Sequence, residues 1–210
     1  MELKGKRFLV IGGAGLIGSH TIDQLLKEDV AEIRIYDNFC RGNEENLANA
    51  LKDQRVNIFE LGGEVIHRDI LSTAMKGMDG VFHFAALWLL HCWEYPRSAF
   101  EVNIAGTFNV LEAMVENRVK RLVYSSSASV YGNAVEEPMQ EDHPFNNTNF
   151  YGATKIAGEQ MCRALYHRYI NTDRSFDYVG LRYMNVYGAR QDYRGAYIAV
   201  IMKILDNLEK

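Results

Sequence analysis

Short apolar runs and segments with helical spacing alternate along the first part of the chain. Arg7–Ile11 is rich in branched apolar side chains and predicts a buried strand. Ser19–Glu28 has apolar residues at positions 22, 25 and 26, the spacing of one helix face. Glu32–Tyr36 predicts a second buried strand. Between residues 38 and 68 the chain is polar and includes a glycine pair, so the element boundaries stay open there.

The same rhythm continues to about residue 170. Gly80–Phe84 and Lys120–Tyr124 predict buried strands, and Phe100–Val115 predicts a helix that packs on the sheet between them. A further helix is predicted over Tyr151–Ile170. Strands that alternate with helices favour an α/β fold, a doubly wound parallel sheet of the Rossmann type with helices on both faces. No internal repeat and no Pro/Gly/Ser-rich linker interrupts this pattern.

Bulky side chains cluster just after the strand at 80–84. Trp88-Leu89-Leu90-His91-Cys92-Trp93 predicts a loop that either faces a ligand or plugs a buried gap, and both alternatives stay open. We do not interpret His91 and Cys92 as a base and a nucleophile, because adjacent side chains rarely point at one another. His83 lies inside the strand and is interpreted as a packed residue rather than a catalyst.

Composition narrows the class of protein. The chain has 210 residues, of which 48% are hydrophobic and 24% charged, enough for one sizeable globular domain and part of a second. The net charge of −4 and the lack of a basic run argue against a nucleic-acid partner. The longest apolar run, about Val81–Leu90, is too short to cross a bilayer. Met1–Lys6 lacks the apolar core of a secretory signal.

The three cysteines, Cys40, Cys92 and Cys162, are far apart and form no C-x-x-C pair. This spacing predicts neither a disulfide framework nor a zinc site. It fits a protein of the reducing cytosol.

A glycine-rich turn joins the first strand to the first helix. Gly13-x-Gly15-x-x-Gly18 and Gly12-x-x-Gly15-x-x-Gly18 both match dinucleotide-binding patterns, and spacing alone does not separate them. Such glycines let backbone amides and a helix N-terminus approach a pyrophosphate. Asp37 ends the second strand 19 residues past Gly18, where a carboxylate suits the ribose hydroxyls of NAD and repels the 2′-phosphate of NADP. Arg41 lies nearby and would tolerate such a phosphate.

Hydroxyl and amine side chains gather at the far end of the predicted sheet. Ser125-Ser126-Ser127 follow a strand, and Tyr151 and Lys155 share one face of the next helix. A free tyrosine has a pKa near 10, and a nearby ammonium favours its phenolate. With a serine hydroxyl, this pair can take a proton from a carbinol while a nicotinamide takes the hydride.

The chain resembles the extended short-chain dehydrogenase/reductase family, and within it the NAD-dependent sugar-nucleotide epimerase/dehydratase group. The resemblance covers essentially all residues. The motifs that carry it are Gly12–Gly18, Asp37-Asn38, Asp69-Ile70, His83–Ala86, Asn103–Thr107, Ser125–Gly132, Tyr151-x-x-x-Lys155 and Leu181–Gly188.

The resemblance implies a role for each of these positions. It selects Gly12, Gly15 and Gly18 as the phosphate turn and implies that Ser127, Tyr151 and Lys155 are catalytic. The residues expected to bind NAD are Gly12, Gly15, Leu16, Ile17, Gly18, Asp37, Asn38, Arg41, Gly42, Asp69, Ile70, Phe84, Ala85, Ala86, Asn103, Ser125, Tyr151, Lys155 and Tyr183. The residues expected to bind the substrate are Trp88, Ser127 and Asn185, and no metal ligand is expected.

The residues after Ser127 divide the family further. Dehydratases and decarboxylases of this group carry an acid there, whereas this chain has Ala128-Ser129. Eliminating water needs an acid and a base beyond the tyrosine, so the resemblance favours 4-epimerisation of a UDP-sugar through a 4-keto sugar. The alternatives are another nucleotide-sugar dehydratase or reductase, or a non-catalytic NAD-binding regulator. Regulators on this fold usually lack the tyrosine or lysine that this chain keeps.

The resemblance also implies a domain plan. Residues 1–180 are expected to form the NAD-binding domain, and residues 181–210 to begin a smaller substrate lobe, with a helix over Gly195–Lys210. Family members extend well beyond residue 210, so the rest of that lobe is expected to be absent from this sequence. A cytoplasmic homodimer is the expected assembly.

Overall fold

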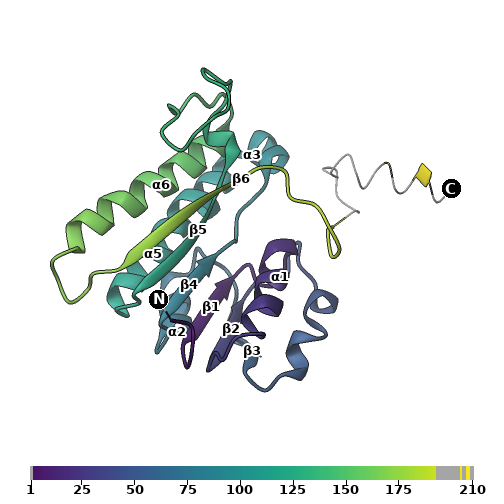
Figure 1. Cartoon of the computed structure of the whole chain (residues 1–210), viewed down its shortest axis with the longest axis vertical. Helices are drawn as coiled ribbons and strands as arrows, with labels where there is room; N and C mark the ends of the chain where they lie inside the picture. The colour runs from purple at the N-terminus through teal and green to yellow at the C-terminus, as the bar shows by residue number, and fades with distance from the viewer. Residues whose placement is uncertain (1, 193–203, 205–206, 209–210) are drawn as a thin grey trace.

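Six parallel strands form one sheet in the order β3-β2-β1-β4-β5-β6 (Figure 1). The computed structural model describes residues 2–192, 204 and 207–208. The doubly wound parallel sheet expected from the sequence is confirmed. The strands are β1 (Arg7–Ile11), β2 (Glu32–Tyr36), β3 (Val56–Ile58), β4 (Gly80–His83), β5 (Arg121–Ser127) and β6 (Asp177–Tyr183).

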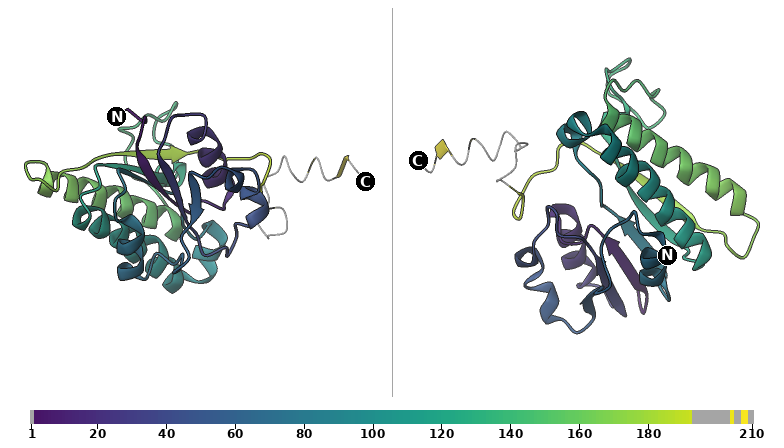
Figure 2. Two further views of the ribbon diagram at one scale, coloured as in Figure 1. Left: turned by 90° about the horizontal axis from the view of Figure 1, so that it is seen from below. Right: turned by 180° about the vertical axis from the view of Figure 1, so that it is seen from behind.

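Helices cover both faces of the sheet (Figure 2). The α-helices are α1 (Leu16–Leu25), α2 (Arg68–Met75), α3 (Leu89–Glu94), α4 (Pro96–Ala99), α5 (Gly106–Glu116) and α6 (Phe150–Tyr169). Short 3₁₀ turns are η1 (Glu44–Leu47), η2 (Ala50–Lys52) and η4 (Ala128–Val130), and η3 (Phe100–Ala105) is a π-helical segment.

Alternation along β1 divides the core into two layers. Phe8 and Val10 join the cluster formed with α1 and β2, whereas Leu9 and Ile11 join the cluster formed with α2 and α5. All four side chains are nearly inaccessible to solvent. Because successive side chains on a strand point to opposite faces, one apolar run anchors helices on both sides of the sheet.

Several elements differ from the pattern-based expectations. The segment Trp88–Trp93 is mostly helical, since α3 begins at Leu89, so the predicted loop is wrong over most of its length. The helix predicted over 100–115 begins as the π-helical η3 before continuing as α5. The three serines end β5, as predicted, and they extend the strand that was predicted to reach only Tyr124. The domain boundary expected at residue 180 falls within β6 and remains a prediction. The helix expected over 195–210 lies almost entirely outside the described residues.

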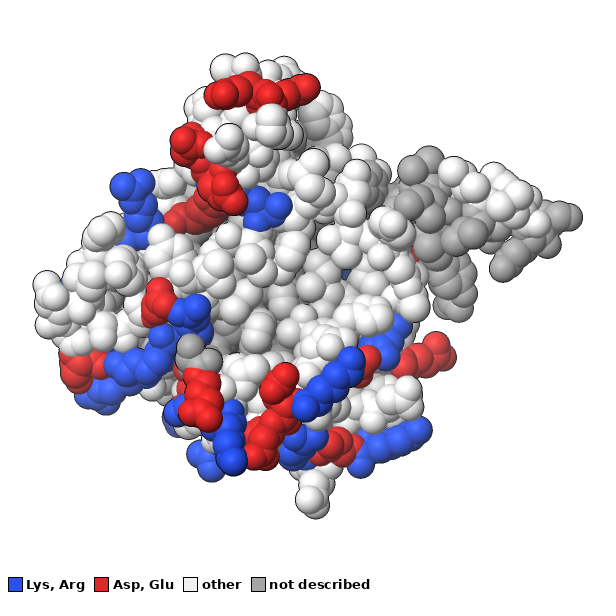
Figure 3. Space-filling view, in the orientation of Figure 1, with Lys and Arg blue, Asp and Glu red and all other residues white. Residues whose placement is uncertain are grey.

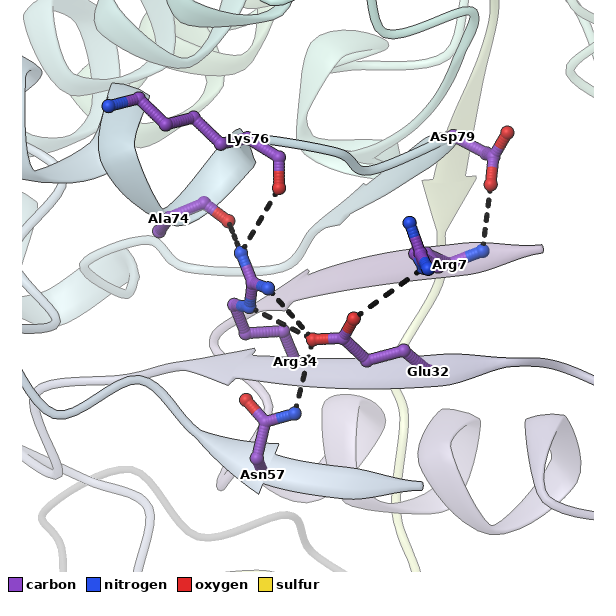
Figure 4. A network of polar contacts seen from close by, with 7 residues as sticks. All are labelled: Arg7, Glu32, Arg34, Asn57, Ala74, Lys76 and Asp79. Atoms are coloured by element: carbon purple, nitrogen blue, oxygen red, sulfur yellow. Dashed lines mark hydrogen bonds and ion pairs between the residues drawn. The ribbon is translucent and has the colours of Figure 1, made fainter. Parts of the chain in front are cut away.

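A polar network joins the starts of the first strands (Figure 4). Glu32 accepts hydrogen bonds from Arg34 Nη2 at 2.8 Å and from Asn57 Nδ2 at 3.2 Å. Arg34 Nη1 donates to the carbonyl of Ala74, 2.7 Å away, at the end of α2. A cation at a helix C-terminus satisfies carbonyls that have no partner within the helix. The network therefore links β2 to β3 and to the end of α2. It lies toward the amino ends of the strands, and the glycine turn lies at their carboxyl ends.

Charged side chains of both signs are interspersed along the lower part of the face in Figure 3. Within the described residues, no helix is long and apolar enough to span a membrane. In the same part of the chain, no group of three or more His, Cys, Asp or Glu side chains is placed to hold a metal ion. The cysteines are free, with Cys40 exposed and the other two buried.

Candidate functional site

The glycine turn lies where the strand order reverses, between β1 and β4. Open α/β sheets bind ligands at this point, outside the carboxyl ends of the strands. A Cβ on Gly12 would lie 2.7 Å from the Ala85 amide nitrogen, and one on Gly18 would lie 2.2 Å from the Gly12 carbonyl oxygen. Both distances are too short for any real Cβ. Glycine at 12 and 18 is therefore what lets β1, α1 and the end of β4 approach one another.

Gly15 is different, because its surroundings do not require glycine. Its backbone is extended, with φ −74° and ψ 176°, which any residue can adopt. A Cβ there would make only an ordinary contact, 3.4 Å from the Gly12 oxygen. Yet Gly15 lines a cavity and precedes the first turn of α1, where backbone N–H groups lack helical partners. The missing side chain leaves room for a ligand at the helix N-terminus, which fits the pyrophosphate of a dinucleotide.

The cavity is about 140 Å³ and follows the ends of β1, β2 and β4. It brings together many of the residues predicted to bind NAD: Gly12, Gly15, Asp37, Asn38, Arg41, Gly42, Phe84, Ala85 and Ala86. It also contains residues that the sequence did not single out: Tyr36, Cys40, Gly63, Glu64, Val65, Leu87 and Val102.

Asp37 is fixed by the backbone around it. Its Oδ2 accepts from the Ala14 amide and its Oδ1 from the Phe39 amide, both at 2.8 Å. Burial raises the pKa of Asp37 above its usual value, and these two hydrogen bonds partly offset the rise. A carboxylate oxygen has further lone pairs, so the side chain can still accept from ribose hydroxyls. The two contacts fix the orientation of the Asp37 carboxylate, and its contact with the ribose remains a prediction.

Gly63 has the clearest sequence signal among the cavity residues that were not predicted from the sequence. A Cβ there would lie 2.0 Å from the Asp37 carbonyl oxygen. The glycine pair at 62–63 could therefore have indicated a close chain approach. Next to it, Glu64 accepts from Asn38 Nδ2 at 2.9 Å, and its carbonyl accepts from the Tyr36 hydroxyl at 2.8 Å.

Arg41, which lines the cavity, is in contact with Trp88. The Arg41 guanidinium lies 4.3 Å from the centroid of the Trp88 ring and 3.5 Å from the Asp192 carboxylate. The Trp88 ring also packs against His91 in a tilted arrangement, with 5.0 Å between the ring centroids. The segment therefore shows both predicted features. The Trp88 ring contacts a residue of the cavity lining, and Cys92 is fully buried.

The predicted proton-handling residues meet where β5 and α6 come together. Asn149 caps α6 by accepting from the Gly152 amide at 2.8 Å, which places Tyr151 and Lys155 in the first turns. Lys155 is 3% exposed, and its Nζ donates to the Ser125 carbonyl at 2.8 Å. The same Nζ lies 5.6 Å from the centroid of the Tyr151 ring. The lysine therefore connects the end of β5 to the tyrosine one helical turn before it.

Ser127 and Tyr183 are register partners on β5 and β6. Ser127 Oγ accepts from the Ser129 amide at 3.1 Å, so it also begins the turn η4. Tyr183 is half-buried, and burial raises the pKa of its phenol. Ser127 and Tyr183 are thus the last residues of β5 and β6, close to where Lys155 of α6 contacts β5.

Asn103 has a clear structural role. Its Oδ1 accepts from the Leu87 amide at 2.7 Å, and its Nδ2 donates to the Leu87 carbonyl at 3.0 Å. Nδ2 also lies 3.3 Å from Thr154 Oγ1, beside the lysine on α6. Asn103 therefore links the cavity wall to α6, and its predicted direct contact with NAD remains a prediction.

His83 is a packed strand residue, as predicted. It is 2% exposed, and its Nε2 is 3.0 Å from Thr107 Oγ1. Burial, with the Lys155 charge as the smaller cause, lowers the pKa of His83 to about 3. Its imidazole is therefore neutral at ordinary pH.

Some predicted residues lie outside the cavity. Gly18 is buried beneath the turn, and Asp69 is exposed in the first turn of α2. The same holds for Leu16 and Ile17 in α1, for Ile70 in α2, and for Asn185 beyond β6, which is exposed. Their contacts with a cofactor or substrate remain predictions.

Lys155 should give the folded protein a measurable pH dependence. Burial lowers its pKa from 10.5 to about 8, with a small opposing effect from Cys92. Between pH 8 and 10.5 the unfolded chain keeps a proton that the folded chain has lost, so stability should rise with pH. We expect Lys155→Met to remove this component, measured as the difference between the two proteins' urea unfolding free energies from pH 7 to 10.5. Parallel curves for the two proteins would contradict the assignment.

Comparisons with known proteins agree with this geometry. The family model described as NAD dependent epimerase/dehydratase family matches residues 8–210. A UDP-glucose 4-epimerase of Halalkalibacterium halodurans is 38% identical over 184 residues, covering 86% of this chain and 51% of the relative. A putative UDP-glucose 4-epimerase of Methanocaldococcus jannaschii is 35% identical and covers 96% of this chain and 63% of its own length.

Solved structures give the same result. A UDP-N-acetylglucosamine 4-epimerase from Methanobrevibacter ruminantium has a TM-score of 0.88 and 33% identity, covering 98% of this chain and 63% of that one. A dTDP-glucose 4,6-dehydratase from Streptomyces venezuelae, solved with NAD bound, has a TM-score of 0.84 and 30% identity, with coverage of 96% and 62%. The chain thus spans only about half to two thirds of these relatives. With the glycine turn, Asp37 and the Tyr151–Lys155 pair in place, the chain belongs to the NAD dependent epimerase/dehydratase family.

Proposed function

We propose that the protein epimerises a nucleotide sugar, in the first place a UDP-hexose at C4, with NAD as a bound cofactor. The observation that carries the proposal is the placement of Lys155, buried against the end of β5 and 5.6 Å from the centre of the Tyr151 ring. An ammonium in that position favours the phenolate of a tyrosine. Related 4-epimerases, and the solved relatives that contain NAD, support the proposal.

The described residues fit the cofactor in three places. The turn at Gly12 and Gly15, with the N-terminus of α1, suits the pyrophosphate, and Asp37 suits the adenosine ribose. The small side chains of Ala85 and Ala86 form the wall on which a flat ring can lie. When bound, NAD supplies a reversible hydride acceptor for the sugar carbon, and it ends each turnover unchanged.

The chain's own residues handle the proton. Tyr151, as the phenolate, accepts the proton of the sugar O4 hydroxyl and later returns it. Ser127 hydrogen-bonds the reacting oxygen, and Lys155 stabilises the phenolate charge. Because the pKa of Lys155 is about 8, turnover should decline as the pH rises above that value.

The absence of an acid after Ser127 favours epimerisation over dehydration. Ala128 and Ser129 occupy the two positions there, and Ser129 Oγ lies 3.2 Å from Ser127 Oγ. Neither side chain can serve as the carboxylate that the elimination of water needs. The alternatives are a dehydratase or reductase of the same family, or a regulator without turnover.

A substrate panel separates these alternatives. The protein is incubated without added NAD with UDP-glucose, UDP-galactose and their N-acetyl and uronic forms, and C4 epimers are measured by NMR. We expect a mixture of epimers, with deuterium supplied at C4 retained there. In a parallel reaction with NAD added, release of label into free NADH would indicate a reductase running in reverse. Solvent deuterium at C5 would indicate dehydration or C5 epimerisation, and no change in any sugar would favour the regulator.

We also propose that the protein is a homodimer in a reducing compartment. Phe100 in η3 and Phe108 in α5 have large apolar side chains that are 44% and 39% exposed, as expected of residues that a second subunit covers. The three free cysteines fit a reducing compartment. Light scattering after size exclusion tests the assembly, and a monomeric mass would contradict it.

A further inference from the structure

Arg182 on β6 makes a two-point ion pair with the helix that carries Tyr151. Its Nε donates to Glu159 Oε1 at 2.9 Å, and its Nη2 donates to Glu159 Oε2 at 2.8 Å. The two side chains are only 16% and 15% exposed. A bidentate pair of this kind fixes orientation as well as distance. Glu159 lies one turn after Lys155 and two turns after Tyr151 on α6.

Glu159 also reaches β5. Ser126 Oγ donates to Glu159 Oε1, and Ser126 is the register partner of Arg182. One turn earlier on the helix, Lys155 Nζ donates to the carbonyl of Ser125. Two side chains of α6 are therefore bound to consecutive residues of β5, immediately before Ser127. These bonds fix the distance between Tyr151 and Ser127, the two hydroxyls that are proposed to handle the proton.

The same guanidinium holds the segment 131–149, which leads into α6. Its carbon lies 4.9 Å from the ring centroid of Tyr131 and 5.2 Å from that of Phe145. Its Nη1 donates to the Glu141 carbonyl at 2.9 Å. The segment ends at Asn149, whose side chain caps the helix. Arg182 thus joins three pieces of chain that all converge on Tyr151.

We propose that Arg182 is a positioning residue, which acts through Glu159 and segment 131–149 to hold Tyr151 in line with Ser127 and the reacting hydroxyl. The inference rests on the proposed function. Arg182 itself touches neither the proton nor the sugar. Proton transfer needs heavy atoms within hydrogen-bond distance, and displacement by about 1 Å costs on the order of 10²-fold in rate. A loosened helix start should therefore lower turnover more than it lowers binding.

The chain contains a matched control. Arg121 and Asp177 form an ion pair between the same two strands at their other end, and they are also register partners. Their side chains are 37% and 62% exposed, so this pair should matter little. Arg121→Met removes an ion pair between β5 and β6 without touching α6 or segment 131–149.

The experiment compares Arg182→Met, Arg182→Lys and Arg121→Met with the wild type. Circular dichroism and thermal unfolding first establish that each variant is folded. We then expect Arg182→Met to lower kcat by about 10²-fold with KM changed less than threefold, and to alter the pH profile of kcat. Arg182→Lys should recover part of the loss, and Arg121→Met should stay within twofold of the wild type.

Hydrogen exchange gives a readout that does not depend on activity. Arg182→Met should lose amide protection in residues 131–155 while β1 keeps its protection, and Arg121→Met should not. Unchanged protection of residues 131–155 in Arg182→Met would overturn the positioning proposal, whether or not the wild type epimerises a sugar. A wild type that epimerises no sugar would defeat only the proposed function. A folded Arg182→Met with wild-type kcat, a change confined to KM, or an equal loss in Arg121→Met would also overturn the positioning proposal.

Discussion

Tyr151→Phe should reduce turnover by roughly 10²- to 10⁴-fold, the range typical of removing a general acid–base group. The substitution keeps the ring, which is half-buried in the first turn of α6, and removes only the hydroxyl. Lys155 would keep its bond to the Ser125 carbonyl, so the helix should stay in place. We therefore expect the loss in kcat, with NAD retention and thermal stability close to the wild type.

Tyr169→Phe provides the control for this result. Tyr169 is also half-buried on α6, but it is the last residue of the helix, far from β5's carboxyl end. Removing the Tyr169 hydroxyl should leave kcat within twofold of the wild type. The assay is epimer formation by NMR, at saturating sugar nucleotide, on protein whose bound NAD has been quantified. Activity of Tyr151→Phe within threefold of the wild type would show that another group takes the proton.

The parts of the site that depend on neighbouring residues were predictable from the sequence. The glycine turn, Asp37 and the ends of β1 and β2 follow from a strand, a turn and a helix in direct succession. The spacing of Tyr151 and Lys155 follows from the period of a helix, and α6 has nearly the predicted bounds. These predictions needed no knowledge of which segments meet in space.

The missed features depend on contacts between distant segments. β6 carries the run Asp177–Tyr183, in which Gly180 interrupts the apolar pattern, and its pairing with β5 is what makes it a strand. The π-helical turn at Phe100–Ala105 leaves no periodic signature in the sequence, so this segment is predicted as an ordinary part of the helix. The pairing of Arg182 with Glu159 spans 23 residues and needs the folded sheet to exist.

The helix α3 shows how tertiary context overrides local interpretation. Bulky side chains after a strand suggested a loop, but Leu89–Glu94 is helical and buries Cys92 completely. The Cys92 thiol contacts the Leu87 carbonyl just before α3, and it accepts from Asn103 Nδ2, which comes from η3. Those partners cannot be inferred from the spacing of six residues.

Gly15→Ala and Gly18→Ala should separate the ligand's requirement for glycine from that of the fold. A Cβ on Gly18 would lie 2.2 Å from the Gly12 oxygen and 2.7 Å from the Gly13 Cα, both backbone atoms. Helix α1 would have to move away from the turn, and overpacking of this kind costs about 1–3 kcal/mol or more. Gly18→Ala should therefore lower the unfolding free energy even without NAD, and NAD binding should weaken with it.

Gly15→Ala should weaken NAD binding without destabilising the fold, because its Cβ would meet nothing closer than 3.4 Å in the chain itself. We expect its unfolding free energy without NAD to stay within about 0.5 kcal/mol of the wild type. Its affinity for NADH should fall by at least roughly tenfold, a change of about 1.4 kcal/mol, because the methyl group enters the space at the start of α1. Urea unfolding and NADH fluorescence titration measure the two quantities. Equal affinity of Gly15→Ala and the wild type would mean that the pyrophosphate does not lie against this turn.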